Sequence, residues 1–415
     1  MEFLNKFFSV DHLRDVPRGV TLVAVSRTIR WIGWGFGESL IPIFLLAFSH
    51  SFTETGLFKS VYDIAFLLAL PIVSLVADSV SSRTLMVLAL LIYPFVGISY
   101  FLAGITGIGI LIIFARGFNG IAYCLDTIGV DTYLRRTAPK HAESSVFGYI
   151  ESVTNFGWIM AALFGFFLIK YIPVYVLLLL IAPTSYLALL PLRRLKDGQP
   201  NTTRAASVLH SYQALFQNVR TWHVGQRRVA ILTFFLALTS GISTFFLPIA
   251  AYEGGASLQE VILMTVLFSL PFLGAWSISN IVDYTNKRIL LLVLLFMLPV
   301  LFLFVAAAPS YTVEALAAFA VETIAVGENL ILQAYITVIS PRERFGSITG
   351  AMDGISEIAA VVTPILAGIV ADIVGLRGMF AVIGVLSLGV AFYAYRYPIT
   401  HRIPDDPVPT FVPLP

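Results

Sequence analysis

Charged residues are scarce in this sequence of 415 residues. Asp, Glu, Lys and Arg together make up only 12% of the chain, whereas a soluble domain carries about 25%. Hydrophobic residues account for 58%, and the mean hydropathy is +0.88. A water-exposed surface cannot be built from this composition, so we expect lipid to surround most of the chain.

Cysteine and catalytic motifs are also rare. The single cysteine, Cys124, excludes a disulfide framework and a cysteine-rich metal site. The six histidines fall outside the apolar runs and form no HExxH or similar cluster. The absence of a glycine-rich phosphate loop argues against ATP-driven transport. We therefore expect no cofactor, no metal and no enzymatic activity.

Long apolar runs are what the sequence does contain. We count twelve, and each approaches or exceeds the roughly 20 residues that cross a bilayer. They predict an all-α membrane protein with twelve transmembrane helices in two six-helix bundles. The expected spans are 19–48, 53–77, 83–104, 106–134, 143–170, 173–193, 229–250, 257–281, 287–307, 311–338, 343–370 and 375–397.

A polar segment separates the two groups of six runs. We assign residues 1–193 to an N-terminal bundle and 229–397 to a C-terminal bundle. Residues 194–228 form a cytoplasmic linker in which apolar residues recur at helical spacing, which predicts an amphipathic helix on the membrane surface. Residues 398–415 form a proline-rich cytoplasmic tail that we expect to be disordered.

The two groups of runs carry the same pattern. The hairpin Ser74–Arg83 returns as Ser279–Arg288, since 279 − 74 and 288 − 83 both equal 205. Upstream, Gly35 and Pro42 return as Gly241 and Pro248 with an offset of 206. A fixed offset near half of the chain length indicates two copies of one unit. In a membrane protein, a repeated half is typical of a transporter.

Lysine and arginine predict the orientation. Four of the 26 lie well inside the spans, Lys170 and Arg377 lie at span ends or in loops on one side, and the other 20 lie at span ends or in loops on the opposite side. Positive residues gather on the cytoplasmic side of a membrane. We therefore expect a multi-pass protein of the plasma (inner) membrane with both chain ends in the cytoplasm.

The repeated hairpin, combined with twelve spans, resembles the major facilitator superfamily, whose loop signature is G-x-L-A-D-R-x-G-R-[RK]. The resemblance is greatest to the drug/proton antiporter-like members, and it implies two bundles that alternately expose a central cavity. Ala77, Asp78 and Arg83 match the signature, Asp283, Lys287 and Arg288 remain in the second copy, and Ser74, Ser79, Ser81 and Ser82 replace glycines and other basic residues.

The same resemblance implies an inner gate. Asp78 would face the N-terminal end of span 11, and Arg83 would reach Asp131 at the inner end of span 4. In the second copy, Asp283 and Arg288 would have the equivalent role. The alternative is that these charges only fix the hairpin topology at the membrane surface.

Charged residues within the spans are costly, by about 2.5–3.5 kcal/mol each, so we expect them to face a cavity or a partner. In span 1, charged and aromatic residues recur every three or four positions on one helical face. Among them, Glu38 is the acid that we assign to the carried proton. The stripe consists of Arg27, Arg30, Trp31, Trp34, Glu38 and Pro42.

Arg116 lies about 15 Å into span 4, near the bilayer midplane. The run from Arg116 to Gly120 resembles the family motif R-x-x-x-G, whose arginine is associated with proton coupling. We therefore group Arg116 and Asp126 with Glu38 as the proton-coupling residues. The alternative is a static buried pair of Arg116 with Glu38 or Asp126, which adds little stability.

Span 5 partly matches the antiporter motif G-x8-G-x3-G-P-x2-G-G. Gly148, Gly157 and Gly165 are in register, whereas alanines replace the G-P pair. The alternative is that these small residues serve helix packing. Asn155 lies on one face of the same span with Glu151 and is a candidate for the substrate cavity.

The second half lacks an acid at the position of Glu38, where Thr244 stands. Its acids lie in spans 10 and 11 instead and predict an acid-lined wall, which favours a cationic or hydrogen-bonding substrate. In the first half, Lys59 and Asp63 are one turn apart and should pair. The cavity candidates are Arg30, Trp31, Trp34, Asn155, Glu322, Asn329, Asp353 and Glu357.

The sequence therefore predicts a secondary active transporter, proton-coupled, that moves a small organic solute by alternating access, with efflux or antiport favoured. The alternatives are a proton-coupled symporter of a sugar or other nutrient, and a receptor of this fold that does not transport. We expect lipid, protons and a small-molecule substrate as partners, no nucleic acid, and a monomeric protein. The identity of the substrate is not encoded in any motif that we recognise.

Overall fold

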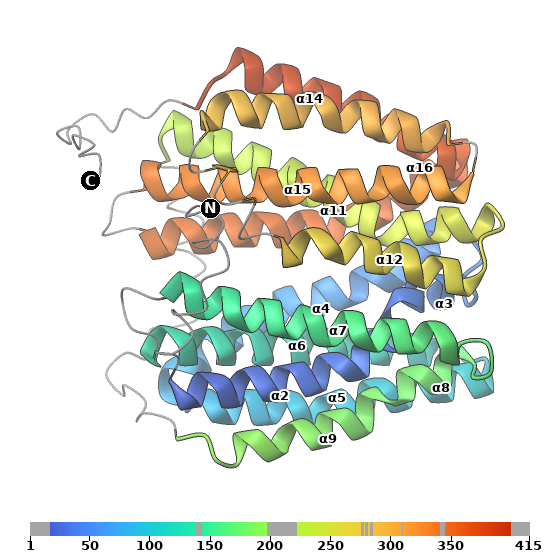
Figure 1. Cartoon of the computed structure of the whole chain (residues 1–415), viewed down its shortest axis with the longest axis vertical. Helices are drawn as coiled ribbons and strands as arrows, with labels where there is room; N and C mark the ends of the chain where they lie inside the picture. Colours follow the sequence, from blue (N-terminus) through green and yellow to red (C-terminus); the bar gives the residue numbers. More distant parts are fainter. Residues whose placement is uncertain are drawn as a thin grey trace, which may run out of the picture.

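The structure is a computed structural model that describes residues 17–137, 143–196, 222–274, 278, 281–282, 285–308, 310–340 and 345–399. Every regular element within these residues is a helix. The helices run side by side along one direction and form two groups, with α2 to α9 below and α11 to α16 above in Figure 1.

We call the two groups of helices the first half and the second half of the molecule. The first half contains α2 (Arg18–Gly35), η2 (Glu38–Leu40), α3 (Ile41–Leu46), α4 (Phe52–Ser79), α5 (Ser82–Thr106), α6 (Ile110–Thr137), α7 (Glu143–Leu168), α8 (Val174–Leu179) and α9 (Ile181–Leu192). The second half contains α11 (Val224–Glu253), α12 (Leu258–Leu273), α14 (Lys287–Ala306), α15 (Tyr311–Ile339) and α16 (Phe345–Arg396).

These helices supply the twelve expected spans. Nine helical segments in the described part of the chain are long and apolar enough to cross a membrane, and α2 with η2 and α3 forms a tenth that is bent by 41°. One of the nine, α16, contains two helices joined at Gly375, and the shorter apolar helix α12 completes the set. The predicted fold class is thereby confirmed. The central part of the linker, 197–221, and the tail from 400 onward lie outside the described residues.

Side-chain caps define where several helices begin. The hydroxyls of Ser51 and Ser81 accept from backbone N–H groups in the first turns of α4 and α5. Ser257 forms a capping box with Glu260 at the start of α12. Such caps satisfy N–H groups that have no partner within the helix. They explain how short polar connections can separate long apolar helices.

Two helices differ from the sequence-based spans. Span 1 was expected as one helix over 19–48, but Gly35 ends α2 and Gly37 precedes the short turn η2. Spans 11 and 12 were expected to be separated by a loop at 371–374. Instead, Gly375 alone joins them, with φ 77° and ψ 164°. Glycine adopts this backbone conformation without steric cost.

The two halves contact each other through α4 with α16, α7 with α12, and α3 with α11. We call the end of the molecule that holds Arg18 and Arg396 the terminal end, and the opposite end the far end (Figure 1). Near the far end α4 and α16 cross closely, because a Cβ on Gly56 would lie 2.1 Å from Pro364 O and one on Gly368 would lie 2.4 Å from Phe52 O.

Hydrogen bonds reinforce this crossing, which we call the seam. The Asp372 carboxylate accepts from Phe52 N at 2.8 Å, from Thr53 N at 2.9 Å and from Thr53 Oγ1 at 2.5 Å. Nearby, Ser60 Oγ donates to Val361 O at 2.8 Å. An anion at the start of α4 is stabilised by the positive end of the helix dipole. The seam therefore closes the molecule between α4 and α16 at the far end.

Candidate functional site: a charged cavity between the halves

A cavity of about 570 Å³ lies between the two halves. The short turn η2 and helices α2, α3, α4, α6 and α7 line it from the first half, and α11, α12 and α15 line it from the second. The seam closes the far end. Toward the terminal end the cavity wall meets solvent, since the side chain of Glu151 is 55% exposed. The cavity is thus accessible from one end of the molecule.

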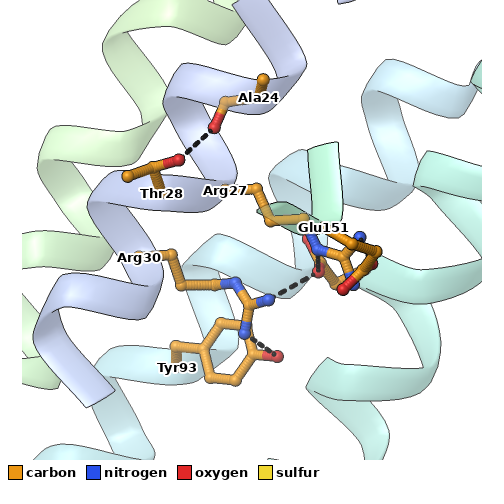
Figure 2. Close-up of polar contacts among 7 residues, drawn as sticks. Ala24, Arg27, Thr28, Arg30, Tyr93 and Glu151 are labelled. Atoms are coloured by element: carbon orange, nitrogen blue, oxygen red, sulfur yellow. Dashed lines mark hydrogen bonds and ion pairs between the residues drawn. The ribbon is translucent and has the colours of Figure 1, made fainter. Parts of the chain in front are cut away.

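Two arginines of α2 are fixed by carboxylates (Figure 2). Arg27 Nη1 donates to Glu151 Oε1 at 2.8 Å. Arg30 Nη2 donates to Asp126 Oδ2 at 2.9 Å, and Arg30 Nη1 donates to the Tyr93 hydroxyl at 3.0 Å. Arg27 Nε also lies 3.8 Å from Asp126. These contacts tie α2 to α5, α6 and α7, and they neutralise both guanidinium groups.

Glu38 is placed by the break in the first span. The backbone turns at Gly37, and η2 carries the Glu38 side chain toward α7 on the cavity wall. There Trp158 Nε1 donates to Glu38 Oε2 at 2.6 Å. Glu38 makes no ion pair with any residue that the structure describes, although Arg30 and Arg116 act on it through space. Its carboxyl is therefore free of a fixed counter-ion while it faces the cavity.

Arg116 also lines the cavity, from α6. Its side chain is 5% exposed, and Nη2 donates to Lys59 O at 3.2 Å. The guanidinium carbon lies 4.8 Å from the centre of the Tyr62 ring. The static pair of Arg116 with Asp126 or Glu38 is not formed, because Asp126 pairs with Arg30 and Glu38 bonds to Trp158.

The lysine of α4 has a partner on its own helix. Lys59 Nζ lies 2.8 Å and 2.7 Å from the two carboxylate oxygens of Asp63. The predicted pairing of these residues, one helical turn apart, is confirmed. Lys59 lines the same cavity as Arg116, but Asp63 neutralises its charge.

The second half presents a mostly neutral wall. Glu322 is its only acid on the cavity among the described residues, and it is 1% exposed. Ser243 Oγ donates to Glu322 Oε1 at 2.6 Å. Thr244 lines the cavity at the position equivalent to Glu38. The acidic wall expected in this half is thus reduced to one carboxyl.

The residues predicted from sequence to line the cavity fall into two groups. Asn329 and Asp353 are exposed and Glu357 is half-buried, and the cavity lining does not include them. Asp126 lies directly behind the wall, where it holds Arg30. The residues that do line the cavity are Arg30, Trp31, Trp34, Glu38, Arg116, Asn155 and Glu322.

The residues of the predicted inner gate are only partly described. Arg83 Nη2 donates to Arg193 O at 3.4 Å, and Asp131 lies in α6 on the terminal side of Asp126. Arg288 is exposed near the start of α14. Asp283 and the Asp78 side chain lie outside what the structure describes. The gate therefore stays a prediction.

Sequence reasoning gave no role to several residues that build the site. Tyr93 and Trp158 are apolar in the hydropathy pattern, and only their contacts show that they orient Arg30 and Glu38. Asp372 was not considered because it belonged to an expected loop. The helical face shared by Glu151 and Asn155 was the one signal that could have found Glu151 as the partner of Arg27.

Two helical bundles around a charged cavity, closed at one end by a seam, are the architecture of a membrane carrier. The sequence profile of the Major Facilitator Superfamily matches residues 23–327 and 229–412. The chain belongs to this family. No curated protein matches the chain in sequence.

Solved structures of transporters share the fold. A nucleoside transporter superimposes with a TM-score of 0.74 at 14% identity, covering 92% of this chain and 100% of that chain. A POT family transporter in complex with 5-aminolevulinic acid gives 0.74 at 13% identity, with coverages of 92% and 96%. A human organic anion transporter gives 0.65 at 17% identity, with coverages of 90% and 98%. At these identities the likeness concerns the fold.

Proposed function

We propose that this protein is a secondary active transporter that couples proton movement to the movement of a small organic solute by alternating access. Glu38 carries the proton, Arg116 responds to its charge, and Asp126 holds the neighbouring Arg30 in place. The observation that carries the proposal is the Glu38 carboxyl, which lines a one-sided cavity without a fixed counter-ion.

The proton role follows from the surroundings of Glu38. A carboxyl held away from bulk water by Trp158, and acted on by two nearby guanidinium groups, changes its proton affinity whenever those groups are engaged elsewhere. A solute that draws Arg116 away would favour the protonated form of Glu38. Proton binding and solute binding are thereby linked at one site.

Alternating access needs two closures, one at each end. The seam is the closure at the far end. For the terminal end we propose the hairpin gate, in which Asp78 and Arg83 act with Asp131, and Asp283 with Arg288 in the second half. Rigid-body movement of one half against the other would exchange the two closures.

The direction of coupling separates antiport from symport. The partial antiporter motif on α7 supports efflux, but its glycines also meet a packing need. A Cβ on Gly157 would lie 2.5 Å from Thr28 Cγ2, and a Cβ on Gly165 would lie 2.5 Å from Phe36 O. These contacts account for the glycines without antiport, so the direction must be measured.

The proposal also covers the oligomeric state, the membrane and the orientation of the protein. We propose a monomer in the plasma (inner) membrane, with both chain ends in the cytoplasm. The orientation rests on the 20 lysines and arginines expected on one side of the membrane. Cysteine labelling from each side of intact cells would check the placement of the two ends.

The deciding experiment uses proteoliposomes with a pH-sensitive dye inside. A panel of sugars, nucleosides, amino acids and organic acids is added, and solute-induced proton flux is recorded. Glu38→Gln should abolish this flux while the variant remains folded. Glu253→Gln is the matched control, since Glu253 is exposed at the far end of α11.

Three outcomes would contradict the proposal. Unchanged proton flux in Glu38→Gln would remove Glu38 from the mechanism. Solute flux without proton movement would indicate a facilitator. Binding of a solute with no flux at all would favour the receptor that the sequence left open.

A further inference from the structure

We infer that Arg116 binds a carboxylate group of the transported solute, so that the substrate is a small organic carboxylate. The inference rests on the proposed transport function and names the substrate class of that same cavity. It differs from the sequence-based expectation of a cationic or hydrogen-bonding substrate, because it depends on how the charges of the wall are paired.

The positive charges of the cavity wall are four in number among the described residues, and three of them have carboxylate partners. Arg27 pairs with Glu151, Arg30 with Asp126 and Lys59 with Asp63, with closest N···O distances of 2.8, 2.9 and 2.7 Å. The fourth is Arg116. Its guanidinium has no carboxylate oxygen within 4.0 Å in the part of the chain that the structure describes.

Within the described part of the chain, the direct contacts of Arg116 are with uncharged groups, and Asp63, which pairs with Lys59, acts on it only through space. Arg116 donates one hydrogen bond, to the backbone oxygen of Lys59, and it lies against the Tyr62 ring. It also faces the hydroxyl of Tyr100. Its Nε is buried and has no hydrogen-bond partner among the described residues. A guanidinium presents five N–H donors in a planar fork, so most of the hydrogen-bonding capacity of Arg116 remains unused.

An unpaired buried guanidinium is unfavourable, because a charge removed from water needs a partner of opposite sign. A carboxylate satisfies the planar fork with two parallel hydrogen bonds. Since the cavity wall supplies no such partner to Arg116, an entering solute is the group that can. The position of Arg116 on the cavity lining makes it available to that solute.

The rest of the wall limits the solute further. One unmatched positive charge balances one negative charge, and the other cations of the cavity wall among the described residues already pair with carboxylates. This disfavours a phosphate dianion or a dicarboxylate. Trp31, Trp34 and Phe268 provide flat apolar surface on the same cavity, which suits an aliphatic or aromatic body. The class is therefore a monocarboxylate with a compact apolar body.

Binding to purified protein tests the inference without requiring transport. A panel of aliphatic and aromatic monocarboxylates, each paired with its own primary amide, is screened by thermal stabilisation in detergent. Each amide keeps the shape of its acid but removes the charge. We expect at least one acid to stabilise the protein, its amide to have no effect, and Arg116→Gln to weaken binding by about 30-fold or more.

Arg228→Gln is the matched control. Arg228 also donates to a backbone oxygen, that of Pro398, and lies over a tyrosine ring, that of Tyr397, at 5.7 Å, but it does not line the cavity. The Arg228→Gln variant should bind the acid with the same affinity as the unmodified chain. The Arg116→Lys variant keeps the positive charge but lacks the planar guanidinium, so it should bind the acid with intermediate affinity.

The outcomes separate this inference from the proposed function. Equal binding of acids and amides, binding that survives Arg116→Gln, or no binding by any acid of the panel would overturn the carboxylate assignment. If proton-coupled flux of a neutral or cationic solute is found at the same time, the transport proposal stands. If an acid binds through Arg116 but no flux occurs, the transport proposal fails and the assignment stands.

Discussion

The two halves share one helical scaffold but place different chemistry on it. The buried pair Arg30 and Asp126 corresponds to apolar residues in the second half. Arg30 corresponds to Leu236 with the offset of 206 that relates Pro42 to Pro248, and Asp126 falls at Ile331 or Leu332 with offsets of 205 or 206. Both leucines line one small cavity inside the second half. The second half thus packs apolar side chains where the first half buries an ion pair.

The same offset connects positions across the central cavity. Lys59 corresponds to Thr265 and Tyr62 to Phe268, and all four line the cavity. Arg116 falls at Val321 with the hairpin offset of 205 and at Glu322 with the offset of 206, and Glu322 also lines the cavity. The fold therefore accommodates charged or apolar side chains at these buried positions, as expected if the charges of the first half serve the proposed transport function.

The largest expected effect comes from breaking the buried pair. Asp126→Leu leaves Arg30 without its carboxylate and should lower the free energy of unfolding by about 3–5 kcal/mol. The measurement is chemical unfolding in detergent, followed by tryptophan fluorescence.

The double variant Arg30→Leu/Asp126→Leu copies the solution of the second half. It should recover most of the lost stability, because no charge is left unpaired, while proton-coupled transport stays absent. If the double variant were as unstable as the single one, the equivalence between the two halves would not extend to packing.

A smaller effect is expected at the seam, where the two halves are joined. Asp372→Asn removes the charge at the start of α4 and should weaken the closed far end by about 1 kcal/mol, which is roughly a fivefold shift in population. Spin labels at Tyr171 and Tyr252, introduced after Cys124→Ala, would report the distance between the halves. Their distance distribution should gain a longer component.

Glu314→Gln is the control for this measurement, because Glu314 lies in the first turn of α15 near the far end, and α15 is not among the helices that pack substantially on α4 in the described residues. An identical distance distribution in Asp372→Asn and the unmodified chain would mean that the glycine crossing closes the far end without help from Asp372.

The smallest effect is expected on the neutral wall. Glu322→Gln should change the free energy of unfolding by about 0.5 kcal/mol or less, since the amide oxygen still accepts from Ser243 and no cation loses a partner. The same unfolding assay compares it with Asp126→Leu. A loss as large as that of Asp126→Leu would show that the second half also depends on a buried charge.

Much of the fold could be predicted from hydropathy. The expected spans 287–307 and 311–338 agree closely with α14 and α15, because apolar length is a strong signal in a membrane protein. The break before Glu38 was less visible, since a glycine allows a bend but does not require one. The continuous connection between the two helices of α16 was not predicted, because a single residue between them leaves no polar loop to recognise.

The sequence predicted many of the residues that line the cavity, but it did not predict most of the pairs that their charged side chains form. The stripe on span 1 located the cavity wall, and the spacing of Lys59 and Asp63 was sufficient to predict their bond. The choice of Asp126 for Arg30 rather than Arg116 depends on where α5 and α6 lie against α2, and sequence spacing carries no information about this packing. That Arg116 has no carboxylate partner in the described part of the chain became apparent only from the contacts in the structure.

Gly375 has a mechanical consequence for the seam. Asp372 lies three residues before it, and a single residue offers one pair of rotatable backbone bonds and no slack. If α4 separates from the part of α16 before Gly375, the part after Gly375 must either rotate about this residue or move together with the first part. The far end would then open by a hinge motion about one glycine, and not by movement of a flexible loop.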